Sequence, residues 1–198
     1  MTLTQAAFGK TTLGKQALMV VAGSLFIAIA AQISVPFFPV PLTLQTLAIL
    51  IVGLTLGARL GAVTLIAYLA QGAAGLPVFA NGGAGLPYMM GPTFGFLLGF
   101  VAMAWIVGYA ADRGWARGFV GAAVASLVAS AVIYIPGIAW PMAVASATGV
   151  EAGWVGQAFG SYYWTYFIAP FLLGDAVKAV LASLVVTGAW KLLEKRFA

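Results

Sequence analysis

The chain has 198 residues, of which 63% are hydrophobic and 7% are charged, and its formal net charge is +5. Soluble domains carry roughly 25% charged residues, so this composition excludes an ordinary soluble protein and indicates an integral membrane protein. Cysteine and histidine are both missing, which excludes disulfides and thiolate nucleophiles and removes the commonest metal ligand and general base. We therefore expect no catalytic residues, no metal site and no cofactor.

The segment before the first apolar run is predicted to be a cytoplasmic tail. Its sequence FGKTTLGK (8–15) contains the Gly-Lys-Thr core of a phosphate-binding loop. However, Thr4 stands where that motif needs its first glycine, and no buried strand precedes it. Lys15 leads directly into a full-length apolar run, so we expect no cleavable signal peptide. The sequence thus predicts no nucleotide site in this chain.

Six apolar runs follow, each close to the roughly 20 residues that a helix needs to cross a bilayer, although the third is short. They cover residues 16–35, 42–58, 60–71, 94–111, 119–140 and 165–193. We predict an all-α integral membrane protein in which residues 1–198 form a single membrane domain with six transmembrane helices.

Lysine and arginine residues set the predicted orientation. In a six-span topology, one side of the membrane receives Lys10, Lys15, Arg59, Arg113, Arg117, Lys191, Lys195 and Arg196. The opposite side receives no lysine or arginine in its loops. The positive-inside rule then places both termini in the cytoplasm. The net positive charge is explained by this orientation and by attraction to anionic lipid, so we expect no nucleic-acid partner.

The outer side is predicted to consist of segments 34–45, 71–93 and 141–165, which are rich in proline, glycine and aromatic residues. Segment 71–93 has too many glycines and prolines for an uninterrupted helix but is too apolar for an ordinary solvated loop. Such backbone reaches membrane depth only where protein or a water-filled cavity satisfies its polar groups. It is therefore either a loop at the headgroup level or a partly inserted loop that caps a ligand pocket.

The sixth run contains a pair of opposite charges in the sequence PFLLGDAVKAVLASLVV (170–186). Asp175 and Lys178 are expected on one helix face in the outer half of the span, about 4.5 Å apart along the axis. An ionisable residue inside a span usually faces the bundle interior or a cavity and marks function. The alternative is an ion pair that only satisfies itself, but apolar residues could replace such a pair with little loss. The pair favours a site for a small ligand with a polar head and an apolar body.

The energy source for any uphill transport is predicted to lie outside the chain. A carrier driven by protons or sodium commonly has a series of carboxylates along its spans. This chain has four acidic residues in all, and they form no such series. A partner must then supply the energy.

Two sequence blocks resemble the BioY type of biotin-specific S component, which belongs to the energy-coupling factor (ECF) vitamin transporters. The first block has the core P-x-x-P-V-P-x-T-L-Q-T (36–46), and the second has P-F-x-x-G-D-x-x-K (170–178). The stretch MGPTFGFLLGF (90–100) lies between them, and the resemblance covers nearly the whole chain.

The resemblance implies a multi-pass protein of the bacterial plasma membrane that captures biotin from outside. It implies partnership with a transmembrane coupling protein, the T component, and two ATP-binding-cassette ATPases. In that family the Asp and Lys of the last helix line the biotin pocket, which corresponds to Asp175 and Lys178 here. The outer loops close the site, which implies roles for Asn81, Thr43 and Gln45.

The chemistry of biotin fits these residues. The ureido ring offers two N–H donors and one carbonyl acceptor, which one carboxylate and one ammonium group can recognise. The apolar ring and chain are expected to pack on aromatic residues and methionine, for which the alternative is ordinary packing or an interfacial aromatic belt. The candidates are Phe79, Tyr88, Met89, Trp164 and Tyr166. No second outer cation is present for the valerate, so backbone N–H groups of residues 81–85 or hydroxyls would serve it; the reverse orientation stays open.

Partner contact and two other functions complete the predictions. Small residues on the first span form a strip that would let another helix approach closely, either from the coupling protein or from the same chain. They are Gly23, Ser24, Ala28, Ala30 and Ala31. A stand-alone carrier of biotin or a related vitamin is the alternative function. An intramembrane enzyme that uses Asp175 is disfavoured, because no second catalytic group accompanies it.

Overall fold

The computed structural model describes residues 2–9 and 11–197, with side chains described up to residue 195. Lys10 and the side chain of Arg196, both predicted to be cytoplasmic, lie outside this description. The described elements in chain order are α1 (Leu3–Phe8), α2 (Leu13–Gln32), β1 (Ser34–Val35), β2 (Leu42–Thr43), α3 (Gln45–Leu56), α4 (Ala58–Ala73), η1 (Ala80–Gly82), α5 (Gly85–Met89), α6 (Phe94–Asp112), η2 (Trp115–Arg117), α7 (Phe119–Val132), α8 (Tyr134–Thr148), η3 (Phe159–Ile168) and α9 (Ala169–Phe197).

The chain is all-helical apart from one short ribbon in its described part, and several helices suit a membrane. Four helical segments are long and apolar enough to cross it, namely Leu13–Gln32, Phe94–Asp112, Phe119–Thr148 and Phe159–Lys195. α3 has 12 residues and α4 has 16, which is fewer than the roughly 20 that span a bilayer without tilt or thinning. By length and composition the structure thus supports four spans, and a count of six requires α3 and α4 to cross as well.

The two helical segments on either side of the last outer connection extend further into that connection than predicted. α8 continues to Thr148 through Pro141, and η3 already begins at Phe159. The prediction of a loop over 141–165 was therefore wrong in extent, because only 149–158 is non-helical. The physical reason is that good helix formers follow Pro141, and the helix ends only at Gly149, whose φ of 68° gives a left-handed cap.

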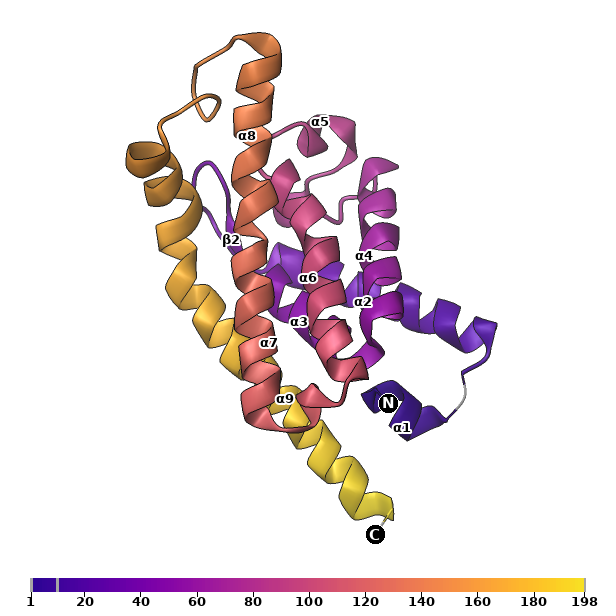
Figure 1. Ribbon diagram of the computed structural model, residues 1–198. Coiled ribbons are helices and arrows are strands. Elements are labelled where there is room, and N and C mark those ends of the chain that lie inside the picture. The colour runs from indigo at the N-terminus through magenta and orange to yellow at the C-terminus, as the bar shows by residue number, and fades with distance from the viewer. Residues whose placement is uncertain (1, 10, 198) are drawn as a thin grey trace.

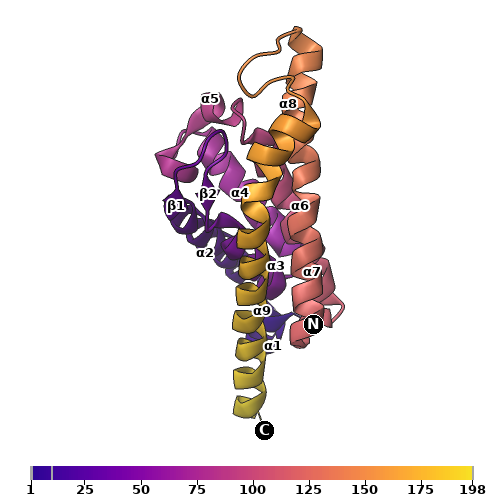
Figure 2. The ribbon, with the colours of Figure 1, turned by 90° about the vertical axis from the view of Figure 1, so that its left-hand side faces the viewer.

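The other two outer segments differ from each other in structure. Segment 34–45 forms a ribbon in which Ser34 pairs with Thr43 and Val35 pairs with Leu42. The first long helix accordingly ends at Gln32 and the second begins at Gln45. The predicted first run therefore ended too late, at residue 35, and the predicted second run began too early, at residue 42. The link from α4 to α6 is irregular except for η1 and α5. Figure 2 shows the ribbon and α5 together at one end of the molecule.

The opposite end of the molecule contains the chain termini and the connection between α6 and α7. Figures 1 and 2 place α1 and the last turns of α9 at this end, well away from α5 and the ribbon. Arg117 in the α6–α7 connection lies with its guanidinium 5.1 Å from the ring centroid of Trp190 on α9. The α6–α7 connection therefore contacts the C-terminal helix at this end of the molecule.

α6 lies at the centre of the bundle (Figure 1) and packs against α3, α4, α7 and α8. Glycines bring these helices close together. A side chain at Gly53 would collide with Val107 and Ala104 on α6, and one at Gly95 would collide with the backbone at Pro136. Such small residues let helix backbones approach closely inside a membrane. This packing fixes the positions of α3, α6 and α8, which carry much of the site.

The strip of small residues on α2 packs inside the chain. A Cβ at Gly23 would lie 2.9 Å from Thr64 of α4, and Gln71 of α4 donates a hydrogen bond to the Ser24 hydroxyl at 3.1 Å. Ala30 and Ala31 are buried, and Ala28 packs partly buried against the core. Of the two alternatives for this strip, packing within the same chain therefore describes the structure. The large apolar residues Leu18, Val21, Leu25, Phe26 and Ile29 form the exposed side of α2.

Candidate functional site

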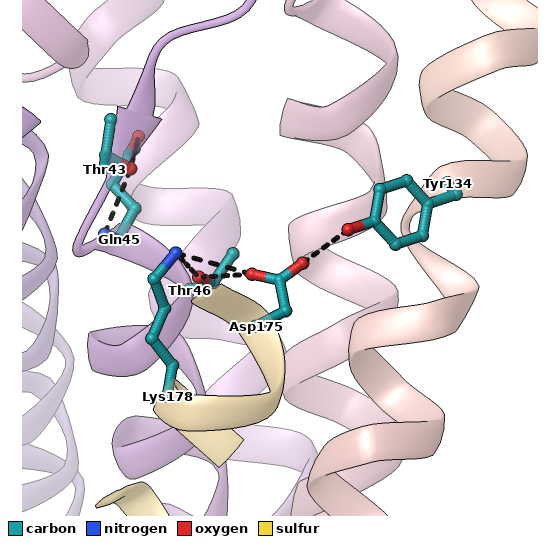
Figure 3. A network of polar contacts seen from close by, with 6 residues as sticks. All are labelled: Thr43, Gln45, Thr46, Tyr134, Asp175 and Lys178. Atoms are coloured by element: carbon teal, nitrogen blue, oxygen red, sulfur yellow. Dashed lines mark hydrogen bonds and ion pairs between the residues drawn. The ribbon is translucent and has the colours of Figure 1, made fainter. Parts of the chain in front are cut away.

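Asp175 and Lys178 lie at the junction of three helices, as Figure 3 shows. Both stand on α9, with Lys178 Nζ 3.4 Å from Asp175 Oδ1. From α3, Thr46 Oγ1 accepts a hydrogen bond from Lys178 Nζ at 2.9 Å and donates to Asp175 Oδ1 at 3.4 Å. From α8, the Tyr134 hydroxyl donates to Asp175 Oδ2 at 2.6 Å. The pair thus connects elements that are far apart in the sequence.

The hydrogen bonds leave capacity for a ligand. A carboxylate has about four acceptor positions and an ammonium group has three donors. The contacts above use Asp175 Oδ1 and Oδ2 and direct two donors of Lys178 to Thr46 and Asp175. Both charged side chains are largely buried, with exposed fractions of 12% for Lys178 and 7% for Asp175. Because they neutralise each other, the group can recognise a neutral polar head without adding net charge to the protein interior.

A second polar chain begins at the N-terminus of α3. The Thr43 hydroxyl donates to Gln45 Oε1 and accepts from the Gln45 backbone N–H, both at 3.1 Å. Gln45 Nε2 donates to the Tyr68 hydroxyl at 2.7 Å, which donates to the carbonyl of Val78 at 2.8 Å. This chain connects the ribbon, α3 and α4 to the irregular link that follows α4.

Both polar groups line an inner cavity with a volume of about 50 Å³. Its polar lining contains Thr43, Gln45, Thr46, Tyr88, Thr93, Tyr134, Asp175 and Lys178. Its apolar lining includes Phe96, Leu97, Phe100, Ile133 and Phe171. Phe96 stacks on Phe171 with ring centroids 6.4 Å apart. The cavity is thus polar where α3, α8 and α9 meet and aromatic beside that junction.

A wider vestibule of about 640 Å³ adjoins the inner cavity. The two share Pro41, Ala80, Tyr88 and Thr93 in their linings. The rest of the vestibule is lined by Pro36, Phe37, Phe38, Pro39, Asn81, Gly83, Pro87, Gly91 and Pro92. Burial raises the pKa of the Tyr88 phenol, so the hydroxyl between the two spaces stays neutral at physiological pH.

The sequence-predicted site residues fall into three groups. Asp175, Lys178, Gln45, Thr43 and Tyr88 meet around the inner cavity. Asn81 lines the vestibule but not the inner cavity. The third group, the other predicted apolar contacts, lines neither space.

Asn81 has a positive φ of 56°, which asparagine tolerates better than most residues. Its side-chain Oδ1 accepts a hydrogen bond from the Ser34 hydroxyl at 2.7 Å. Asn81 is thus tied to the residue where the ribbon begins.

Four predicted apolar contacts lie outside both linings. Trp164 and Tyr166 are 47% and 41% exposed, because η3 turns Tyr163 and Phe167 inward and the residues beside them outward. Phe79 is fully buried and stacks on Tyr88, with ring centroids 5.0 Å apart. Met89 packs partly buried against the core. For these four residues, the alternative of ordinary packing or an interfacial position describes the structure better.

Sequence reasoning missed Thr46, Tyr134, Phe96 and Phe171. Thr46 and Phe171 stand inside the two recognised blocks, where their positions beside Gln45 and before Asp175 were a usable signal. Tyr134 offered a weaker one, since a tyrosine in an apolar run needs a partner for its hydroxyl. Among the described residues, no group of three or more Asp, Glu, His or Cys side chains gathers to hold a metal ion.

The model of the BioY family matches residues 4–195, nearly the whole chain. The probable biotin transporter BioY of Pyrococcus horikoshii is 34% identical over 165 residues, which cover 82% of this chain and 90% of that protein. The biotin transporter BioY of Rhizobium etli is 34% identical over 163 residues, 77% of this chain and 79% of the relative.

A solved structure shares the fold. It is a crystal structure of the S-component for biotin from an ECF-type ABC transporter, with a TM-score of 0.68 at 22% identity, covering 92% of this chain and 95% of that chain. Similarity at this identity establishes the architecture, and the family match with the two relatives establishes kinship. The chain is a member of the BioY family.

Proposed function

We propose that the chain captures biotin outside the cell and carries it across the membrane as the S component of an ECF transporter. The relatives are named as biotin transporters, and the structural neighbour is named as an S-component for biotin. The observation that carries the proposal is the buried, mutually neutralised Asp175–Lys178 pair with its partners Thr46 and Tyr134. The function is that of a transporter rather than an enzyme.

The ureido ring of biotin matches the pair in chemistry. Its two N–H groups can donate to Asp175, and its carbonyl can accept from Lys178. Phe96 and Phe171 provide the apolar surface for the sulfur-containing ring. An analogue that lacks these polar groups leaves buried donors and acceptors unpaired, which costs about 1–3 kcal/mol for each group.

The inner cavity must widen to hold the bicyclic ring. At about 50 Å³ it has space for only a few water molecules. α3, α6 and α8 are held by close helix contacts, whereas Phe38 in the ribbon connection is 70% exposed. We infer that the ribbon and the irregular link around Tyr88 move outward when biotin binds, and that they form the Gly/Pro-rich cap of the pocket.

We also propose six spans, with α3 and α4 crossing the membrane beside the four longer segments, and with both termini in the cytoplasm of a bacterial cell. The charge partition supports this arrangement. Cysteines introduced singly at Glu151 and at Trp115, both exposed, test it with a thiol reagent that does not cross membranes. The Glu151 position should be labelled in intact cells and the Trp115 position only after lysis. Labelling of the Trp115 position from outside contradicts the orientation.

The partners are a T component and two ABC-type ATPases. The purified chain should bind biotin without ATP, because its sequence offers no nucleotide site. Thiamine and riboflavin are the controls for specificity. Concentrative uptake into liposomes should require the T component and the ATPases. Accumulation by the chain alone under a proton or sodium gradient establishes the alternative, a stand-alone carrier, and rejects the S-component proposal.

A further inference from the structure

The two cavities differ in charge. Among the described residues that line the inner cavity, Asp175 and Lys178 carry the charges, and no described residue that lines the vestibule is charged. The remaining described cations lie in α2, in α4, in the α6–α7 connection and in the last turns of α9. Biotin has a neutral end, the ureido ring, and an anionic end, the valerate. The charge distribution therefore decides which end enters first.

A carboxylate does not suit the inner cavity. Lys178 Nζ is already 3.4 Å from Asp175 Oδ1, so a valerate bound to Lys178 would place two carboxylates around one ammonium group. The buried site would then carry a net negative charge, which costs several kcal/mol away from water. The ureido ring adds no charge. Biotin accordingly enters ring first, and its valerate extends into the vestibule.

The described lining of the vestibule offers the valerate no cation. Two of the N–H groups that the sequence suggested for it, those of Gly82 and Gly83, are engaged elsewhere. The N–H of Gly82 donates to Gln32 Oε1 at 2.9 Å. The N–H of Gly83 donates to the Ala80 carbonyl and that of Gly91 to the Tyr88 carbonyl, both at 3.1 Å. The side chains of Asn81, Tyr88 and Thr93 remain as neutral polar groups near the tail. A carboxylate in this wide space keeps most of its hydration and gains little from the protein.

We propose, on the basis of the biotin-binding function above, that this site recognises the ureido ring and does not recognise the carboxylate. Biotinyl amides and esters are then ligands alongside free biotin. The ligand class includes biotin amide, biotin methyl ester and biocytin, in which biotin is joined to the side chain of lysine. The vestibule volume of about 640 Å³ provides room for such extensions.

The test is a binding series on the purified chain. Biotin amide removes the negative charge with almost no change of shape, and biocytin adds length. Both should bind with a dissociation constant within about tenfold of that of biotin, because a lost charge-assisted hydrogen bond would cost roughly tenfold to a hundredfold. A loss of more than tenfold for biotin amide shows that the carboxylate is recognised and overturns the proposal. Failure of biotin itself to bind rejects the proposed function, a result separate from selectivity between tails.

A variant tests the location of the tail. Pro87 is exposed and lines the vestibule, whereas the neighbouring Leu86 is exposed and lines neither cavity. Pro87→Lys introduces a cation that only a charged tail in the vestibule can use. It should improve binding of biotin relative to biotin amide by roughly two- to fivefold, the range of a solvent-exposed ion pair. Leu86→Lys should leave the ratio unchanged. Equal ratios in both variants place the tail elsewhere and overturn the proposal.

Discussion

The inner cavity and the vestibule adjoin each other but are built in opposite ways. The inner cavity lies among packed helices, and its polar groups are bonded to one another across α3, α8 and α9. The vestibule is walled by the proline-rich ribbon connection and the irregular link before α6, and the residues described in its lining carry no charge. Fixed donors and acceptors give selectivity because a mismatched ligand leaves them unpaired. The neutral, irregular vestibule gives the ligand access and tolerates variation in the tail of the ligand.

The largest loss is expected from Asp175→Asn, which removes the carboxylate and leaves Lys178 without its counter-charge in a buried position. Biotin binding should weaken by about 2 kcal/mol or more, roughly thirtyfold, as expected for a buried charge-assisted hydrogen bond. Titration calorimetry measures the loss, and size-exclusion chromatography checks that the variant is folded. Glu151→Gln is the matched control, since Glu151 is exposed and lines neither cavity. Unchanged affinity in folded Asp175→Asn would contradict the site.

The sequence predicted the charged part of the inner cavity well. The spacing of Asp175 and Lys178 in one apolar helix required a shared face, and the structure places them 3.4 Å apart. Their partners were not predictable by spacing. Thr46 is 129 residues from Asp175 and Tyr134 is 41 residues away, and helix packing alone brings them together. Local periodicity contains no information about that packing.

The fold also separates features that local sequence predicts from features that only helix packing decides. Apolar runs located the helices, because length and hydropathy decide what stays in a bilayer. The prediction ended the fifth run at residue 140, just before Pro141, whereas one proline is tolerated inside a membrane helix that neighbours support. It also left open whether Gly23 and Ser24 face a partner or pack within the chain. Small residues pack helices equally well within one chain, and only the contacts with Thr64 and Gln71 distinguish the two cases.

A smaller loss is expected from Tyr134→Phe, which keeps the ring and removes the hydroxyl that donates to Asp175 at 2.6 Å. Asp175 keeps its charge and its contacts with Lys178 and Thr46, so binding should weaken by about 1–1.5 kcal/mol, roughly tenfold. Tyr166→Phe removes an equivalent hydroxyl from a ring that is 41% exposed and should change binding less than twofold by the same titration. Equal losses in the two variants would show that the inner network does not set affinity.

The smallest effect separates the two regions through a pair of phenylalanines. Phe171 lines the inner cavity and stacks on Phe96, whereas Phe38 lines the vestibule and is 70% exposed. Phe38→Leu should change the equilibrium affinity for biotin by less than about threefold, because a ring that stays in water gains little from ligand contact. Phe171→Leu should cost more affinity, since the sulfur-containing ring of biotin loses an aromatic surface that water cannot replace.

Stopped-flow fluorescence gives the association and dissociation rate constants for each variant. If the ribbon controls access, Phe38→Leu alters association and dissociation together and leaves their ratio nearly constant. A larger loss of affinity from Phe38→Leu than from Phe171→Leu would place the main contacts in the vestibule and reverse the assignment of the two regions.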